Sequence, residues 1–398
     1  MNSRFIGGIL LIVGTSIGGG MLALPIANAA TGFWQSSLFL LLCWGMMTLG
    51  ALLILEVTLY LPPGNHMVSM ARETLGTPGL MISWLSYLFL LYTLLCAYIS
   101  GGADVFASLA NYLHLHLSAW QASLLFTTIF GFIVYQGIRS VDLVNRGLMF
   151  GKLGIYVLLV ILIAPHTQLH YIEAGNYRLI SSTVMILITS FGFAIIVPNL
   201  RVYFNNAIKT LRKIVLIGSF IPLLCYIAWD AVIMGSLPTQ GDQGLAALMH
   251  ASRPTSSLAL MLSDTINNRL VTSLFNTFTS ICMLTAFLGV SLCLISFLAD
   301  GLNTQQQGRD GLGLMFLTFT PPLVLVLCYP NAYIYALNYA GIFCVILLLL
   351  LPALMSLKGR NKFNPLYRVA GGKLTPSLVI AFSLILLFNA FDNILRAT

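Results

Sequence analysis

The sequence predicts an all-α membrane protein with two inverted repeats of five helices, discontinuous helices 1 and 6, and an eleventh helix. Hydrophobic residues make up 58% of the 398 residues and charged residues only 8%, against about 25% charged in soluble domains. Eleven apolar segments are long enough to span a bilayer. Two of them, equivalently placed in the two halves, contain residues that interrupt a helix, which is typical of inverted-repeat transporters.

The first apolar segment, Phe5 to Ala30, is interrupted near its middle. Three adjacent glycines, Gly18 to Gly20, disfavour a helix by roughly 3 kcal/mol relative to alanine, and Pro25 lacks an amide donor. Irregular backbone is not tolerated against lipid, so we expect this break to face a cavity lined by protein. An interruption at mid-depth is typical of a solute site in a secondary transporter.

The distribution of basic residues predicts the topology. The segments are centred near Gly18, Met46, Leu91, Thr128, Val157, Phe191, Leu224, Leu284, Pro321, Phe343 and Ile385. With a cytoplasmic amino terminus, 15 of the 19 lysines and arginines fall on the inner side, Lys152 among them, and 4 on the outer side. This asymmetry follows the positive-inside rule. We therefore expect a protein of the inner membrane with a cytoplasmic amino terminus and, after eleven spans, a periplasmic carboxyl terminus.

The sixth segment repeats the pattern of the first. Thr189-Ser-Phe-Gly, followed by Pro198, matches Thr15-Ser-Ile-Gly, followed by Pro25. The matching glycines, Gly18 and Gly192, are 174 residues apart (192 minus 18). Five spans separate the two segments, so they cross the membrane in opposite senses and predict an inverted repeat. Chance resemblance between two glycine-containing helices is the alternative. The predicted units are 1–165, 166–351 and a final 352–398 with a basic loop and the eleventh helix.

A pair of broken helices offers peptide groups to a ligand. A break frees amide donors on one half-helix and carbonyl acceptors on the other, and the helix dipole adds partial charge at each end. The carboxylate and the ammonium of an amino acid can both be held in this way. Because a zwitterion has no net charge, no buried ionised side chain is needed to neutralise it. Phe191 and Phe193 flank Gly192 and either stack on a ligand ring or pack as ordinary core residues.

Several runs together resemble the hydroxy and aromatic amino acid permeases, above all their tyrosine-specific members. The matching runs are Val13–Pro25, Ala97–Gly101, Val141–Arg146, Thr189–Phe193, Phe287–Val290, Leu298–Asp300 and Tyr367–Gly372. They cover nearly the whole chain. The resemblance implies a LeuT-type fold of the amino acid/polyamine/organocation superfamily. It also implies proton-driven symport of an aromatic amino acid, with tyrosine as the first expectation.

The resemblance also implies the residues of a substrate site. The substrate backbone would lie at Thr15, Ser16, Gly18, Gly19, Gly20, Ser190 and Gly192, and its ring near Phe191 and Phe193. Tyr92 on helix 3 and Thr285 on helix 8 are further candidates, chosen by their depth in the membrane.

Two positions depart from the family pattern. Ala194 stands where relatives usually have a histidine, and Ser296 where they tend to have an aspartate. Titratable groups at such depth are usually functional, so their loss leaves proton coupling, sodium coupling and the identity of the substrate open. The remaining intramembrane acids, Glu56 and Asp230, are the candidates for proton coupling. The alternative is that both are structural groups, hydrogen-bonded near helix ends.

Other function classes find little support in the sequence. All seven cysteines lie in apolar runs and the six histidines show no metal-ligand spacing, so neither disulfides nor a metal site is expected. No nucleophile and base pair suggests an enzyme. The net charge of +8 reflects basic residues on the expected cytoplasmic side of the membrane. It therefore does not indicate nucleic-acid binding. We expect an amino acid, a coupling proton and membrane lipid as partners, with no cofactor. A permease of different substrate or coupling, or a sensor or channel on the same fold, is the alternative.

Overall fold

The computed structural model describes residues 3–112, 114–173, 175, 180–241, 244–251, 253–302, 304–305, 308–329, 332–364 and 366–397. In these ranges every regular element is a helix. Nine helices are long and apolar enough to span a membrane, a bent pair at the amino end adds another span, and a shorter apolar helix covers Ala119–Tyr135. Ten of the eleven predicted segment centres fall within these spans and the eleventh, Thr128, in the shorter helix, which confirms the predicted all-α membrane fold.

The elements follow the chain in the expected order. The first half contains α1 (Ser3–Ser16), α2 (Gly19–Ala29), α3 (Phe33–Thr58), α4 (Met67–Leu75), α5 (Thr77–Tyr112), α6 (Ala119–Tyr135) and α7 (Ile138–Ile163). A short connection, η1 (Ala164–His166) and α8 (Leu169–Glu173), precedes the second half and includes the predicted boundary at residue 165.

The second half begins with the other interrupted helix. It contains α9 (Ile180–Ser190), η3 (Gly192–Ile196), α10 (Val197–Tyr203), α11 (Ile208–Ser236), η4 (Leu245–His250), α12 (Pro254–Ile266), α13 (Arg269–Leu302), α14 (Gly308–Cys328), α15 (Ala332–Cys344), η5 (Val345–Leu350) and α16 (Leu351–Lys362). The segment η5 is a π-helical stretch that joins α15 to α16 in one span. The last helix is α17 (Leu374–Ala397).

Glycines with positive φ turn the chain sharply between helices. Gly32 (φ 92°) precedes α3 and Gly76 (φ 78°) separates α4 from α5. Side chains other than hydrogen disfavour this backbone region, so glycine permits a reversal within very few residues. Consecutive helices therefore pack against each other with short connections.

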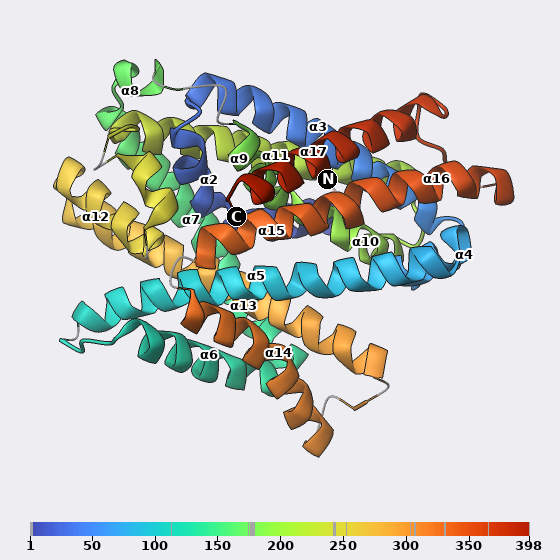
Figure 1. Cartoon of the computed structure of the whole chain (residues 1–398), viewed down its shortest axis with the longest axis horizontal. Helices are drawn as coiled ribbons and strands as arrows, with labels where there is room; N and C mark the ends of the chain where they lie inside the picture. The colour runs from blue at the N-terminus through green and yellow to red at the C-terminus, as the bar shows by residue number, and fades with distance from the viewer. Residues whose placement is uncertain are drawn as a thin grey trace.

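The long helix α5 crosses the middle of the molecule and packs against α15 and α13 (Figure 1). The short helices α4 and α12 lie at opposite ends of the bundle in the same view. The half-helices pack on partners from the second half, α1 on α11 and α2 on α9. The two interruptions are thereby brought together inside the bundle.

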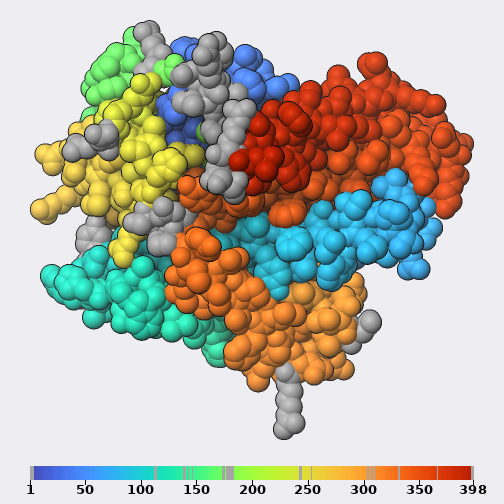
Figure 2. Space-filling view, in the orientation of Figure 1, coloured from blue at the N-terminus to red at the C-terminus, as the bar shows by residue number. Residues whose placement is uncertain are grey.

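The outer surface is apolar, as a bilayer requires. Figure 2 shows α17 in red and α14 in orange at opposite edges of one face, with α5 in light blue between them. Phe388 on α17 and Phe316 on α14 are each 73% exposed. Such exposed apolar side chains on membrane-spanning helices are suited to contact with lipid chains.

Candidate functional site

The first break lies where the sequence predicts it. α1 ends at Ser16 and α2 begins at Gly19, and their axes differ by 51°. Gly18 between them has extended backbone angles, and the last regular bond of α1 is donated by the Ile17 amide to the Val13 carbonyl at 2.9 Å. The whole break is buried, so its free peptide groups face protein and not lipid.

The second interruption lies where the sequence predicts it, but there the helix changes type within a single span, Thr183–Tyr203. α9 ends at Ser190, and Phe191 leaves the α-helical conformation with ψ 29°. A tighter helix follows over Gly192–Ile196, and α10 then begins at Val197. Pro198 occupies the first turn of α10, where its missing amide costs no helical hydrogen bond.

The two breaks are in contact with each other. A Cβ atom added at Gly20 would lie 3.1 Å from Ser190 Oγ and 3.4 Å from Ser190 Cα. The Tyr226 hydroxyl on α11 lies 2.7 Å from the Ser16 carbonyl and 2.7 Å from the Ser190 carbonyl. The Tyr333 hydroxyl on α15 donates to the Gly19 carbonyl at 2.6 Å. Backbone carbonyls from both breaks therefore converge on one buried place.

Aromatic side chains close this place. Phe191 and Phe193 are fully buried, and the Phe191 ring packs against the Tyr226 ring with centroids 5.1 Å apart. A Cβ atom at Gly19 would lie 2.6 Å from the Tyr98 ring. Only glycine leaves room for these rings beside the backbone at this position.

The other predicted substrate residues divide into two groups. The hydroxyls of Ser16 and Ser190 bond to carbonyls of their own helices, Ile12 and Ile186. The Thr15 hydroxyl likewise bonds to the Leu11 carbonyl of α1. Ser16 and Ser190 thus offer backbone carbonyls to the break rather than free hydroxyls, whereas the predicted substrate residue Thr15 is exposed on α1.

Tyr92 and Thr285 have partners of their own. The Tyr92 hydroxyl donates to the Leu317 carbonyl of α14 at 2.7 Å. The Thr285 hydroxyl donates to the Ile281 carbonyl, one turn earlier in α13, at 2.8 Å. No contact recorded for the described residues joins either side chain to the breaks. On α5, the helix that carries Tyr92, Tyr98 is the tyrosine that contacts the first break.

A buried cation lies at the first break. The Lys152 ammonium on α7 donates to the Ile17 carbonyl at 2.5 Å and to the Gly14 carbonyl at 3.4 Å. Its residue is only 2% exposed. The count of basic residues placed Lys152 at the inner surface, and this assignment is wrong, because Lys152 lies within the apolar span Leu143–His166 and is buried against the first break. Carbonyls without helical partners supply the acceptors that a buried ammonium needs.

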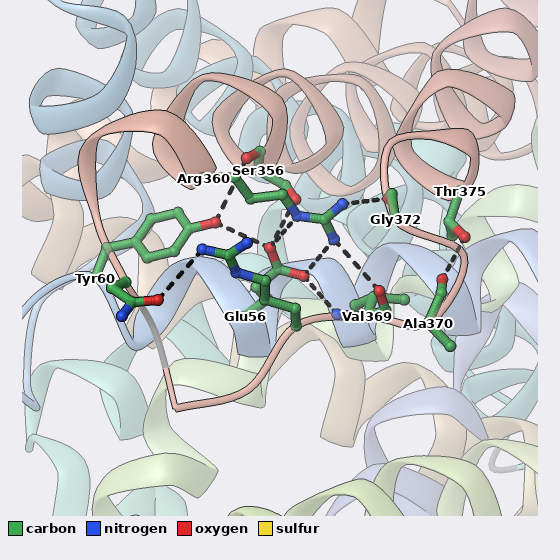
Figure 3. A network of polar contacts seen from close by, with 10 residues as sticks. Glu56, Tyr60, Ser356, Arg360, Val369, Ala370, Gly372 and Thr375 are labelled. Carbon is green, nitrogen blue, oxygen red and sulfur yellow. Dashed lines mark hydrogen bonds and ion pairs between the residues drawn. The ribbon is translucent and has the colours of Figure 1, made fainter.

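Glu56 forms a buried polar network away from the breaks (Figure 3). Arg360 on α16 donates to both carboxylate oxygens, at 2.6 and 2.7 Å. The Val369 amide, the Tyr60 hydroxyl and the Ser356 hydroxyl also donate to this carboxylate. Burial, and then the negative charge of Glu56, raise the pKa of the Tyr60 hydroxyl, so it remains a donor. The network joins α3, α16 and the segment before α17.

Asp230 lies on α11 near the carboxyl end of α2. It is fully buried, and one of its oxygens accepts a bond from the Asn28 side-chain amide at 2.7 Å. Among the described residues its other oxygen has no hydrogen-bond partner. Glu56 and Asp230 therefore differ in kind, since the first carboxylate has a cationic partner and the second has an amide.

Four residues at the breaks were not predicted, namely Tyr98, Lys152, Tyr226 and Tyr333. Tyr98 lies in the run Ala97–Gly101, so the family pattern offered a signal for it. The other three lie on α7, α11 and α15. Sequence alone does not indicate which face of these helices meets the two breaks.

The fold is of the LeuT type, and the family to which the chain belongs makes it a membrane permease. The fold is that of MhsT, solved in complex with L-phenylalanine, with a TM-score of 0.68, 13% sequence identity and 98% of each chain covered. The chain belongs to the tryptophan/tyrosine permease family, whose sequence profile matches residues 1–389.

Individual relatives cover the chain almost completely. It is 33% identical to the tyrosine-specific transport system 1 of Haemophilus influenzae, over 99% of this chain and 98% of that protein. It is 30% identical to the tyrosine-specific transport system 2 of the same organism, over 98% and 97%. It is 31% identical to a tryptophan-specific transport protein of Pseudomonas aeruginosa, over 98% and 94%. These relatives are transport proteins and not enzymes.

Proposed function

We propose that this protein imports an aromatic amino acid, tyrosine in the first place, across the inner membrane by proton symport. The observation that carries the proposal is the convergence of backbone carbonyls from two helix breaks on one hydroxyl group beside a buried aromatic ring. The Ser16 and Ser190 carbonyls suit an ammonium, and the amino end of α2 at Gly19 and Gly20 suits a carboxylate. The substrate ring would lie against Phe191 and Phe193.

Transport would proceed by alternating access around this site. We take residues 1–165 and 166–351 as the two inverted halves, each beginning with a broken helix. The fold that the chain shares with MhsT supports this division, although identity of 13% bears on fold alone. Rocking one group of helices against the other would expose the site to each side of the membrane in turn.

Tyrosine is proposed ahead of tryptophan because two similar relatives carry tyrosine in their names. A tryptophan-specific relative has similar identity, and a glutamine transporter of Aliivibrio fischeri is 28% identical. Counterflow in proteoliposomes with labelled tyrosine, tryptophan, phenylalanine, leucine and glutamine tests the choice. We expect tyrosine to exchange fastest. Exchange of none of them would favour the alternatives, a permease of a different substrate or coupling, or a sensor or channel on this fold.

Proton coupling would involve a buried ionisable group close to the substrate. Lys152 is the strongest candidate, because its ammonium bonds two carbonyls of the first break and ionisable groups at such depth are usually functional. When it releases its proton, the break loses a positive charge, and the charge-assisted bonds to its carbonyls become weaker neutral ones. Asp230 is the second candidate, whereas Glu56 already accepts bonds from Arg360, Val369, Tyr60 and Ser356.

Replacing Lys152 with methionine tests this assignment. In Lys152→Met we expect exchange of tyrosine to continue, while an imposed pH gradient no longer drives its accumulation. The exposed Lys209 near the start of α11 provides the matched control, and Lys209→Met should accumulate tyrosine as the wild type does. Accumulation by Lys152→Met at the wild-type level under the same gradient would remove Lys152 from the coupling mechanism.

A further inference from the structure

Tyr226 has an unusual place between the two breaks. It belongs to α11, an unbroken helix, and its side chain is fully buried. Its hydroxyl oxygen is 2.7 Å from the carbonyl of Ser16, the last residue of α1, and 2.7 Å from the carbonyl of Ser190, the last residue of α9. One side chain thus bridges the equivalent ends of both interrupted helices.

A tyrosine hydroxyl has a single proton to donate. It can give a full hydrogen bond to only one of the two carbonyls at a time, or two weaker bonds if the proton is shared. The second carbonyl then faces another oxygen at 2.7 Å, which is an unfavourable contact unless a further donor is supplied. An ammonium group has three donors and can satisfy both carbonyls together.

We propose that the Tyr226 hydroxyl occupies, in the empty protein, the place that the substrate ammonium takes when an amino acid binds. The inference rests on the proposed function and adds to it a residue that competes with the substrate. Phe191 packs directly on the Tyr226 ring. Displacement of the hydroxyl would therefore also shift the Phe191 ring.

The bridge has a consequence for the transport cycle. After releasing its substrate, an importer must return empty, and buried carbonyls without a donor are costly. The Tyr226 hydroxyl replaces one donor of the lost ammonium and keeps the ends of α1 and α9 together. It therefore supports the return step, which net uptake requires and which exchange of one substrate molecule for another does not.

The test is Tyr226→Phe in the full-length protein, with Tyr156→Phe as the matched control. Tyr156 on α7 is also buried among aromatic rings, and its hydroxyl donates to a single carbonyl, that of Cys225, at 2.9 Å. In Tyr226→Phe we expect tyrosine to bind about tenfold more tightly, because one competing hydrogen bond is gone. Net uptake should fall about tenfold while exchange continues, and the control should keep the wild-type ratio of uptake to exchange.

Two results would overturn the proposal. One is weaker or unchanged binding of tyrosine by Tyr226→Phe, and the other is an unchanged ratio of net uptake to exchange. A merely structural hydroxyl would lower the thermal stability of the empty protein without changing that ratio. If the wild type transports tyrosine but the variant behaves like Tyr156→Phe, the role of Tyr226 is wrong and the proposed function still stands. If the wild type transports no amino acid, the proposed function fails first.

A measurement on the wild type keeps the proposal testable if the variant does not fold. The des-amino analogue of tyrosine, 3-(4-hydroxyphenyl)propanoate, retains the ring and the carboxylate but has no ammonium to displace the hydroxyl. We expect it to compete at least a hundredfold more weakly than tyrosine for binding to the wild type. Competition within about threefold of tyrosine would show that no ammonium is recognised at these carbonyls.

Discussion

At the scale of single residues, the site depends on glycines, which have no side chain. Gly19 leaves room for the Tyr98 ring, and Gly20 lets the amino end of α2 approach Ser190. Larger residues would hold the half-helices apart and cover the peptide groups. The glycines are therefore needed for contact between the breaks as well as for the interruption itself.

Gly19→Val tests this requirement. The added Cβ would lie 2.6 Å from the Tyr98 ring, so we expect tyrosine binding to be lost while the protein still folds. Binding and gel filtration of the purified protein give the two readouts. Gly45→Val on α3 is the control, because a Cβ there meets nothing within 4 Å, and it should bind as the wild type does. Unchanged binding by Gly19→Val would show that the substrate does not bind at the first break.

The sequence predicted the breaks but only part of their surroundings. Glycine and proline act on their own backbone, so their effect is visible locally at Gly18–Gly20 and Gly192. The roles of Tyr226 and Tyr333 depend on which faces of two unbroken helices meet the breaks, and no local pattern among 16 tyrosines specifies that. Lys152 was misplaced for a related reason, since charge counting assumes that basic residues lie outside the apolar core.

At the scale of helices, the Glu56 network joins elements that are far apart in sequence. Arg360 bonds Glu56 on α3 and also the carbonyls of Val369 and Gly372, which fixes the segment before α17 against α16. The predicted alternative of a structural, hydrogen-bonded Glu56 agrees with these contacts. Sequence reasoning placed Glu56 in the membrane but could not pair it with an arginine about 300 residues away.

Glu56→Gln should destabilise the protein, because it leaves the Arg360 guanidinium buried without a counter-charge. The expected loss is about 3 kcal/mol or more, seen as a lower midpoint of thermal unfolding in detergent. The double variant Glu56→Gln/Arg360→Met should recover part of it, since both charges are then absent. Glu73 and Lys362 provide the control, with side chains 50% and 60% exposed and 4.0 Å apart. Breaking that exposed pair should change little, and an equal effect of the two substitutions would contradict the role of burial.

At the scale of the whole molecule, eleven apolar segments follow in the predicted order, and the interrupted ones meet at the centre. This agreement arises because the bilayer imposes the same requirements, length and hydrophobicity, on every span. The packing of α5 against α15 and α13 depends on side-chain shapes along whole helices and could not be predicted from composition.

The orientation of the chain in the membrane is the last prediction. The eleven predicted spans would place the two termini on opposite sides, and the excess of basic residues in alternate loops predicts a cytoplasmic amino terminus. A fluorescent protein that matures only in the cytoplasm should be bright when fused after residue 364, before α17, and dark when fused at the end of the chain. Alkaline phosphatase, active only in the periplasm, is the reciprocal control and should give the opposite result. Bright fluorescence from the fusion at the end of the chain would mean that the number of spans or the orientation is wrong, and the direction of the proposed proton-driven import would have to be reconsidered.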